Sequence, residues 1–131
     1  MSQENIDIVR RGFDAWNAGD MDYIRDLYDP NIVLQTVPDW PEPGPHVGRE
    51  AVIRFFVAAR GSLDSDSVEP NTDFIAVADH VLVRHTWHGH GHGPAMKFET
   101  TLIYTLRRGK VIHLEYFWDH AEALKAVGLT E

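Results

Sequence analysis

The apolar residues of this chain change their spacing part way along it, and this change restricts the fold more than any other feature. Near the N-terminus, Ile6, Val9, Phe13 and Trp16 recur every three or four residues, which places them on one face of a helix. From about Val68 to Trp118 the pattern is typical of strands separated by turns. Helices followed by consecutive strands predict an α+β domain whose helices cover one face of an antiparallel sheet, and a parallel βαβ fold is not expected.

Turn and capping residues set the expected boundaries of these elements. Gly19 can take the left-handed conformation that ends a helix, and Asp20 can cap the next one. Pro30 disfavours helix at the residue before it, and Asp119 followed by Glu122 resembles a capping box. The expected elements are helices over about 6–18 and 20–28, a strand over 32–37, a Pro-rich loop over 38–45, a helix over about 49–61, strands over about 68–118 with breaks near 79–80, 89–94 and 108–109, and a helix over about 119–127.

The composition favours a single domain over residues 1–131 and excludes several kinds of site. The chain has 131 residues, enough to bury a core unaided, and it has no cysteine. Disulfide scaffolds, thiolate zinc sites and thiol catalysis are therefore excluded. Twelve basic against twenty acidic side chains give a net charge of −8, which argues against a nucleic-acid partner. Because the N-terminal segment does not resemble a signal peptide and no apolar run approaches the roughly 20 residues of a membrane span, we expect a cytoplasmic protein without a membrane partner.

Five segments, in their order and spacing, resemble the SnoaL-like branch of the nuclear transport factor 2 superfamily. They are NAGD (17–20), YDPN (28–31), GREAVIRFF (48–56), RRGKVIHLEYFWD (107–119) and AEALKAVGL (121–129). The resemblance implies a cone-shaped half-barrel, with N-terminal helices in the concavity of a strongly bent mixed, mainly antiparallel sheet and a short C-terminal helix. It also implies a small apolar ligand in the cone. The superfamily includes ketosteroid isomerases, polyketide cyclases and limonene-type epoxide hydrolases as well as non-catalytic proteins, so the fold does not decide the function.

The carboxylates used by two of these enzyme classes are missing from the matching positions. Ketosteroid isomerases use a base aspartate, an oxyanion tyrosine and a second buried acid. The positions that match these three groups hold Thr36, Gly12 and Thr101. Limonene-type epoxide hydrolases use an arginine between two aspartates, and here Arg84 is retained while the partners become Thr86 and Tyr116. Neither mechanism is expected to operate unchanged, because its acid or base is absent.

Strand alternation indicates which side chains line the cone. The inward faces are expected to carry Phe98, Thr100, Leu102, Tyr104 and Leu106 on one strand and Ile112, Leu114, Tyr116 and Trp118 on the last. Two parities are open for residues 81–88. One of them places inward Val81, Val83, His85 and Trp87. The other, which we favour because the superfamily's functional positions lie there, places Arg84, Thr86 and His88 inward, where a buried arginine would need an acidic partner.

His88 is the first candidate for acid–base chemistry, because imidazole titrates near neutrality. Tyr116 would donate a hydrogen bond to a ligand oxygen, with Arg84 nearby, and Asp39 beside Trp40 in the Pro-rich loop is a second candidate base. The alternative is that His88 ends a strand in solvent and the loop is an ordinary surface turn. The residues expected to contact a ligand are Trp16, Thr36, Trp40, Phe56, Thr86, Leu102, Tyr104, Leu114 and Trp118. Aromatic residues at helical spacing are also typical of an ordinary core.

Four of the eight histidines lie close together in the segment from His85 through His88 and His90 to His92. Neutral imidazoles on one face of an extended segment are typical ligands of a transition metal. The alternating glycines favour a turn instead, and no acidic residue adjoins the run. We therefore expect a glycine-rich hairpin loop, with no metal and no other cofactor.

Two functions are open from the sequence. The first is an enzyme that moves protons on a small apolar molecule, of the isomerase, lyase, cyclase or hydrolase type, in an aromatic pocket. The second is a non-catalytic ligand-binding or dimeric assembly protein, which the missing carboxylates favour and which a pocket below about 300 Å³ would support. With either function we expect a homodimer, because Ile103, Phe117 and Trp87 would otherwise be exposed on the outer sheet face.

Overall fold

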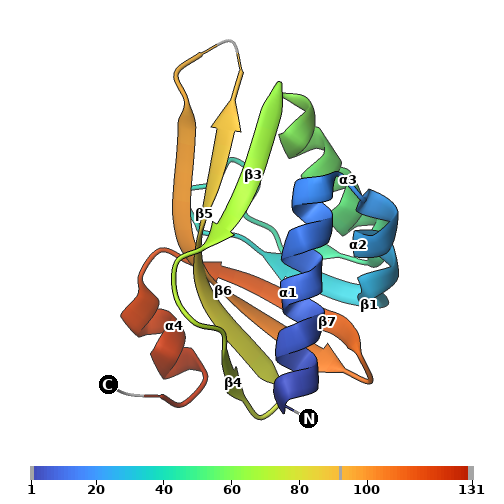
Figure 1. The fold of residues 1–131 in the computed structure, drawn as a ribbon, viewed down its shortest axis with the longest axis vertical. Helices are drawn as coiled ribbons and strands as arrows, with labels where there is room; N and C mark the ends of the chain where they lie inside the picture. Colours follow the sequence, from blue (N-terminus) through green and yellow to red (C-terminus); the bar gives the residue numbers. More distant parts are fainter. Residues whose placement is uncertain (1, 92, 130–131) are drawn as a thin grey trace.

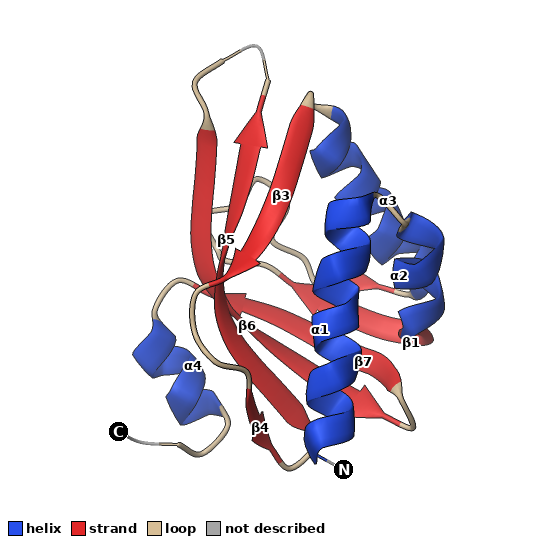
Figure 2. Ribbon diagram, in the orientation of Figure 1, coloured by secondary structure: helices blue, strands red, loops and turns tan. Residues whose placement is uncertain are grey.

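Three helices cover one face of a bent sheet and a fourth helix covers part of the other (Figures 1 and 2). The structure is a computed structural model that describes residues 2–91 and 93–129. Its helices are α1 (Ser2–Ala18), α2 (Met21–Leu27), α3 (Arg49–Gly61) and α4 (His120–Ala126). The predicted caps are confirmed, because the side chains of Asp20 and Asp119 accept hydrogen bonds from the backbone N–H groups of Tyr23 and Ala121. Each cap satisfies a donor that the first helical turn leaves without a partner.

The sheet is mixed and mainly antiparallel, as expected. Its strands are β1 (Tyr28–Gln35), β2 (His46–Val47), β3 (Ser65–Pro70), β4 (Ile75–Val77), β5 (His80–His90), β6 (Met96–Arg107) and β7 (Lys110–Phe117). They are ordered β2-β1-β7-β6-β5-β3, with β4 also paired to β5. The pairing of β1 with β7 is parallel and the other pairings are antiparallel. Because β2 and β3 lie at opposite edges, the sheet is not closed into a barrel, and the predicted α+β class is confirmed.

Two strands depart from the predicted pattern because their pairing is irregular. The strand β1 begins at Tyr28, and its register against β7 shifts around Pro30, a residue that cannot donate to a ladder. The register of β6 against β7 shifts between Thr105 and Leu106. At this shift β7 has one extra residue, Ile112, which reverses the alternation of inward and outward side chains along the strand. Val111 is therefore fully buried in the main core, and the prediction that Ile112 faces inward is wrong.

The main hydrophobic core lies between α1, α2, α3 and the inner face of the sheet. Val9 of α1, Val52 of α3 and Val83 of β5 are each fully buried in it, as is Ile32 of β1. These residues come from α1, β1, α3 and β5 and span positions 9 to 83 of the chain, so the helices and the sheet stabilise one another through shared apolar burial.

A second, smaller apolar cluster lies on the outer face of the sheet. Leu82 and Ile103 are buried there beneath Ala123 of α4, and Phe117 packs against them. Trp87 lies in the main core instead. The prediction that Ile103, Phe117 and Trp87 are exposed on the outer face is therefore wrong, and the expected homodimer stays a prediction without their support.

We expect Leu82→Ala to lower the free energy of unfolding by about 2–5 kcal/mol, because Leu82 is fully buried between the sheet and α4. The matched control is Val57→Ala on α3, where the side chain is 50% exposed and the change should stay within about 0.5 kcal/mol. Chemical denaturation of both variants measures the difference. Equal small losses would show that α4 does not cover this face in solution.

Candidate functional site

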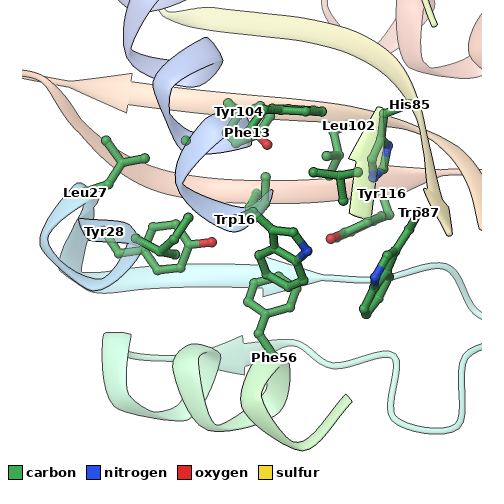
Figure 3. A pocket seen from close by; sticks show the side chains of 14 residues that line it. Phe13, Trp16, Leu27, Tyr28, Phe56, His85, Trp87, Leu102, Tyr104 and Tyr116 are labelled. Carbon is green, nitrogen blue, oxygen red and sulfur yellow. The ribbon is translucent and has the colours of Figure 1, made fainter. Parts of the chain in front are cut away.

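A cavity lies among α1, α2, α3 and the inner face of the sheet, and most of its wall is aromatic (Figure 3). Its volume is about 40 Å³, which is room for a few water molecules. The aromatic side chains on its wall are Phe13, Trp16, Tyr28, Phe56, His85, Trp87, Tyr104 and Tyr116. Of the side chains predicted to contact or act on a ligand, this wall includes Trp16, Phe56, Leu102, Tyr104, Leu114 and Tyr116.

The parity favoured for β5 is wrong, and the alternative parity is the one observed. His85 and Trp87 lie on the cavity wall, whereas Arg84, Thr86 and His88 belong to the other face of the strand. The inward face places Val81, Val83 and Trp87 in the main core. This arrangement buries more apolar surface than the opposite parity would, which is the physical reason for the correction.

Arg84 lies in a polar network on the outer face. Its Nη1 donates to the hydroxyl Oγ1 of Thr101 at 3.0 Å and to the carbonyl oxygen of Trp118 at 3.1 Å. Its Nε lies 3.6 Å from Oε2 of Glu99, which is the acidic partner that the sequence did not reveal. Arg84 therefore connects β5 to β6 and to the end of β7, and it does not reach the cavity.

Thr86 and His88 also have partners away from the cavity. The Thr86 hydroxyl accepts a hydrogen bond from Nδ2 of Asn71 at 2.7 Å. His88 Nε2 lies 3.3 Å from Oε1 of Glu69, whose side chain is largely exposed. A surface contact of this kind contributes little to stability. His88 is thus a surface residue, as its alternative interpretation held, and it is not a candidate base for a ligand in this cavity.

His85 takes the position that was predicted for His88. Burial lowers the pKa of His85 from 6.5 to about 4, despite the hydrogen bond to the carbonyl oxygen of Thr100, so the ring is neutral at pH 7. That bond joins His85 Nδ1 to the carbonyl oxygen at 3.3 Å. A carbonyl can only accept, so Nδ1 carries the proton and Nε2 has a free lone pair. His85 therefore brings a neutral acceptor to the cavity wall.

Three tyrosines place hydroxyl groups around the same cavity. Burial raises the pKa of Tyr28, Tyr104 and Tyr116 above its usual value. Mutual repulsion among the phenolate forms raises the pKa of Tyr28 and Tyr104 further. The phenols are therefore protonated at neutral pH, and each can donate a hydrogen bond to a ligand oxygen.

The sequence did not predict a role for Asp66, which accepts hydrogen bonds from two residues of the cavity wall. Its Oδ2 accepts hydrogen bonds from the indole N–H groups of Trp16 at 2.8 Å and Trp87 at 2.9 Å. Its Oδ1 accepts from Arg60 Nη2 at 2.9 Å. These partners lie up to 50 positions apart in the chain. The available signal was that a buried tryptophan usually requires an acceptor for its N–H, but this signal does not identify the acceptor.

The Pro-rich loop lies beside the aromatic wall and not in it. Trp40 stacks on Trp87 with ring centroids 6.2 Å apart, and Asp39 Oδ2 accepts a hydrogen bond from Trp118 Nε1 at 3.1 Å. Thr36 is buried and donates through Oγ1 to the carbonyl oxygen of Pro43 at 3.0 Å. The side chains of Thr36, Asp39, Trp40 and Trp118 are not part of the cavity wall, contrary to their predicted roles.

The histidine-rich segment forms the end of a hairpin, as predicted, because β5 and β6 pair as far as Gly89 and Met96. His92 lies outside the described residues. Within the described part of the chain, no group of three or more histidine, aspartate or glutamate side chains is placed to hold a metal ion. Among the helices of the same described residues, none combines the length and apolar character needed to cross a bilayer.

Comparison with solved structures identifies several proteins of similar fold. Bal32a, from a soil-derived mobile gene cassette, is 25% identical over 91% of this chain and 92% of its own, with a TM-score of 0.81. A candidate polyketide cyclase from Sinorhizobium meliloti is 28% identical over 84% of this chain and 93% of its own, with a TM-score of 0.69. A candidate SnoaL-like polyketide cyclase from Jannaschia sp. CCS1 is 21% identical over 99% and 95%, with a TM-score of 0.76. No curated protein matches the sequence.

A sequence model of one protein family also matches most of this chain. The model of the SnoaL-like domain matches residues 9–114, from the middle of α1 to the middle of β7. The matched segment includes most of the side chains on the cavity wall, with Tyr116 just beyond it. This chain belongs to the SnoaL-like domain family.

Proposed function

We propose that this protein binds a small, mainly apolar molecule that carries a carbonyl or hydroxyl oxygen, and that it moves a proton on that molecule. One observation carries the proposal: three protonated phenols and one neutral imidazole converge on a cavity whose remaining wall is apolar (Figure 3). An apolar wall with a few convergent polar groups is typical of sites for small molecules. The phenols supply donors and His85 supplies an acceptor.

The chemistry that fits these groups is proton removal from a carbon next to a carbonyl. His85 Nε2 takes the proton, and the electron pair of the broken C–H bond moves into the carbonyl to form an enolate. A phenol such as that of Tyr116 donates a hydrogen bond to the enolate oxygen. Return of the proton from His85 to another carbon isomerises the molecule, and its return to the same carbon restores the starting compound. His85 acts here as the base that ketosteroid isomerases provide with an aspartate.

The comparisons support this class of ligand. The Sinorhizobium meliloti neighbour is described as a candidate polyketide cyclase, and polyketides carry repeated carbonyl groups along a carbon chain.

The low pKa of His85, about 4, does not prevent the reaction, because the ring is unprotonated at neutral pH. An aspartate base of comparable pKa serves in ketosteroid isomerase.

A second candidate, a non-catalytic binding or assembly protein, is favoured by the size of the cavity. Its volume of about 40 Å³ lies far below the roughly 300 Å³ of typical ligand sites, so a ligand must displace wall side chains to enter. If this candidate is correct, the protein binds a ligand without turnover or assembles as a homodimer. Sedimentation at micromolar concentration measures the oligomeric state, and a monomer would contradict the dimer.

We expect the protein to catalyse exchange of the α-protons of cyclohexanone for deuterium in D₂O, measured by proton NMR. His85→Gln should lower the rate by about 10²-fold or more, because it removes the base. Tyr116→Phe should lower the rate by about tenfold, because one of several donors to the enolate is lost.

The matched control is His88→Gln, which changes a histidine on the opposite face of the same strand and should leave the exchange rate unchanged. Binding of cyclohexanone without catalysed exchange would support the non-catalytic candidate. A rate lost in His88→Gln but kept in His85→Gln would contradict the assignment of the base.

We expect the stability of the protein to fall between pH 6.5 and pH 4 in a way that depends on His85. In this window the unfolded chain binds a proton that folded His85, with its pKa of about 4, does not bind. The contribution is fully present above about pH 6.5, and about 2–3 kcal/mol of it is lost by pH 4.5.

Urea denaturation at pH 7 and pH 4.5 measures this loss. His85→Gln should lose less free energy of unfolding between the two pH values than the unmodified protein does, by about 2–3 kcal/mol. His88→Gln, a change at a partly exposed histidine, should lose as much as the unmodified protein. Equal losses in all three proteins would show that His85 is not buried as a neutral ring.

A further inference from the structure

Asp66 is a buried carboxylate with four donors. It lies on β3, its side chain is 7% exposed, and it accepts from Trp16 of α1, Trp87 of β5 and Arg60 of α3. Both indole N–H groups bond to Oδ2, at 2.8 and 2.9 Å, while Arg60 Nε and Nη2 bond to Oδ1 at 3.1 and 2.9 Å. Hydrogen bonds to an ionised acceptor are about twice as strong as those between neutral groups.

Arg60 is committed to this cluster and is not free to bind a ligand. Its Nη2 also donates to the carbonyl oxygen of Trp16 at 3.0 Å, and its guanidinium carbon lies 4.3 Å from the centre of the Trp16 ring. Its Nη1 contacts the sulfur of Met21 at 3.4 Å. The ion pair therefore neutralises the charge of Asp66, so this side of the cavity does not favour a cationic ligand.

The two indoles form a fixed corner of the cavity wall. Their rings are perpendicular, with an interplanar angle of 90° and centroids 5.6 Å apart, and Trp16 also meets Phe56 edge to face at 5.3 Å. In Figure 3 the nitrogen atoms of Trp16 and Trp87 lie on the sides of the rings that face each other. Asp66 is not itself a wall residue, so both indole N–H groups are bonded to an acceptor outside the wall.

We propose that Asp66 is a positioning residue that determines the specificity of the cavity. By accepting both indole N–H groups, it leaves only the carbon surface of Trp16 and Trp87 available to a ligand. Hydrogen bonding to the ligand is thereby reserved for the three phenols and the imidazole. The specificity part of this inference rests on the proposed function, whereas the positioning part does not.

A change at Asp66 has a specific consequence for ligand choice. A buried indole N–H that loses its acceptor costs free energy until it finds another, and because Trp16 and Trp87 both lie on the cavity wall, a change in the orientation of either ring lets a ligand oxygen become that acceptor. Weakening the acceptor therefore gives the cavity extra donors. A variant should then prefer oxygen-bearing ligands over hydrocarbons more strongly than the unmodified protein does.

The positioning part is tested by two-dimensional ¹⁵N–¹H NMR of the four indole N–H groups, with no ligand present. Asp66→Asn keeps the size of the side chain but replaces the charged acceptor, so the proton signals of both Trp16 and Trp87 should move upfield. The signal of Trp118 should not move in this variant, because its acceptor is Asp39.

Two controls make this test specific. Asp39→Asn should move only the Trp118 signal. Asp64→Asn, an exposed carboxylate two residues from Asp66, should move none of the four signals. Unchanged Trp16 and Trp87 signals in Asp66→Asn would overturn the positioning role.

The specificity part is tested by titrating benzene and phenol into each protein and following the amide signals by NMR. Relative to the unmodified protein, Asp66→Asn should raise the preference for phenol over benzene by about threefold, and Asp66→Leu by about fivefold or more where it folds. Tyr116→Phe should lower the same preference, because it removes a donor to the phenol oxygen.

The outcomes separate the two proposals. If neither benzene nor phenol binds the unmodified protein, the proposed function and the specificity part both fail, and the indole signals still decide the positioning role. If both probes bind and the preference is the same in Asp66→Asn as in the unmodified protein, the specificity part alone is overturned. Unchanged binding in Asp64→Asn shows that a nearby loss of charge is not the cause.

Discussion

The carboxylate of Asp66 joins three elements that enclose the cavity, and the arrangement of the wall depends on it. Among the described residues, the strand β3 lies at an edge of the sheet and pairs with β5 alone, so side-chain bonds carry much of its attachment to the helices. Asp66 bonds to α1 and α3 through Trp16 and Arg60. Nearby, the side-chain amide of Asn17 bonds both backbone groups of Val68, as a neighbouring strand would. These contacts satisfy an edge that would otherwise present open backbone groups.

The inner face of the sheet lines the cavity and its outer face packs against α4, and β5 contributes side chains to both faces. Its inward side chains include His85 and Trp87 on the cavity wall. On the outward face, Leu82 is covered by α4, and Arg84 donates hydrogen bonds to Thr101 of β6 and to the carbonyl oxygen of Trp118 just after β7. Side chains alternate along a strand, so a functional residue and a structural one can be neighbours in sequence. The difference between His85 and His88 follows from this alternation alone.

The protonation states in the cavity follow from burial. Removal from water disfavours the charged form of each group, so the histidine stays neutral and the tyrosines stay protonated. The result is a site with donors and an acceptor but without a net charge on its wall. The proposed proton transfer on a neutral carbonyl compound uses these groups in place of the aspartate base of ketosteroid isomerases. Asp66 contributes by accepting both indole N–H groups, so the two tryptophans do not add free donors to the wall.

Local patterns in the sequence determined the order of the elements, the caps at Asp20 and Asp119, and the inward face of β6 around Leu102. These features depend on residues close together in the chain, where spacing and capping chemistry act directly. The parity of β5, the bulge near Thr105, and the pairing of Asp66 with two distant tryptophans were decided only by the tertiary structure. The physical reason is that each of these depends on the packing of segments far apart in the chain, which no local pattern records.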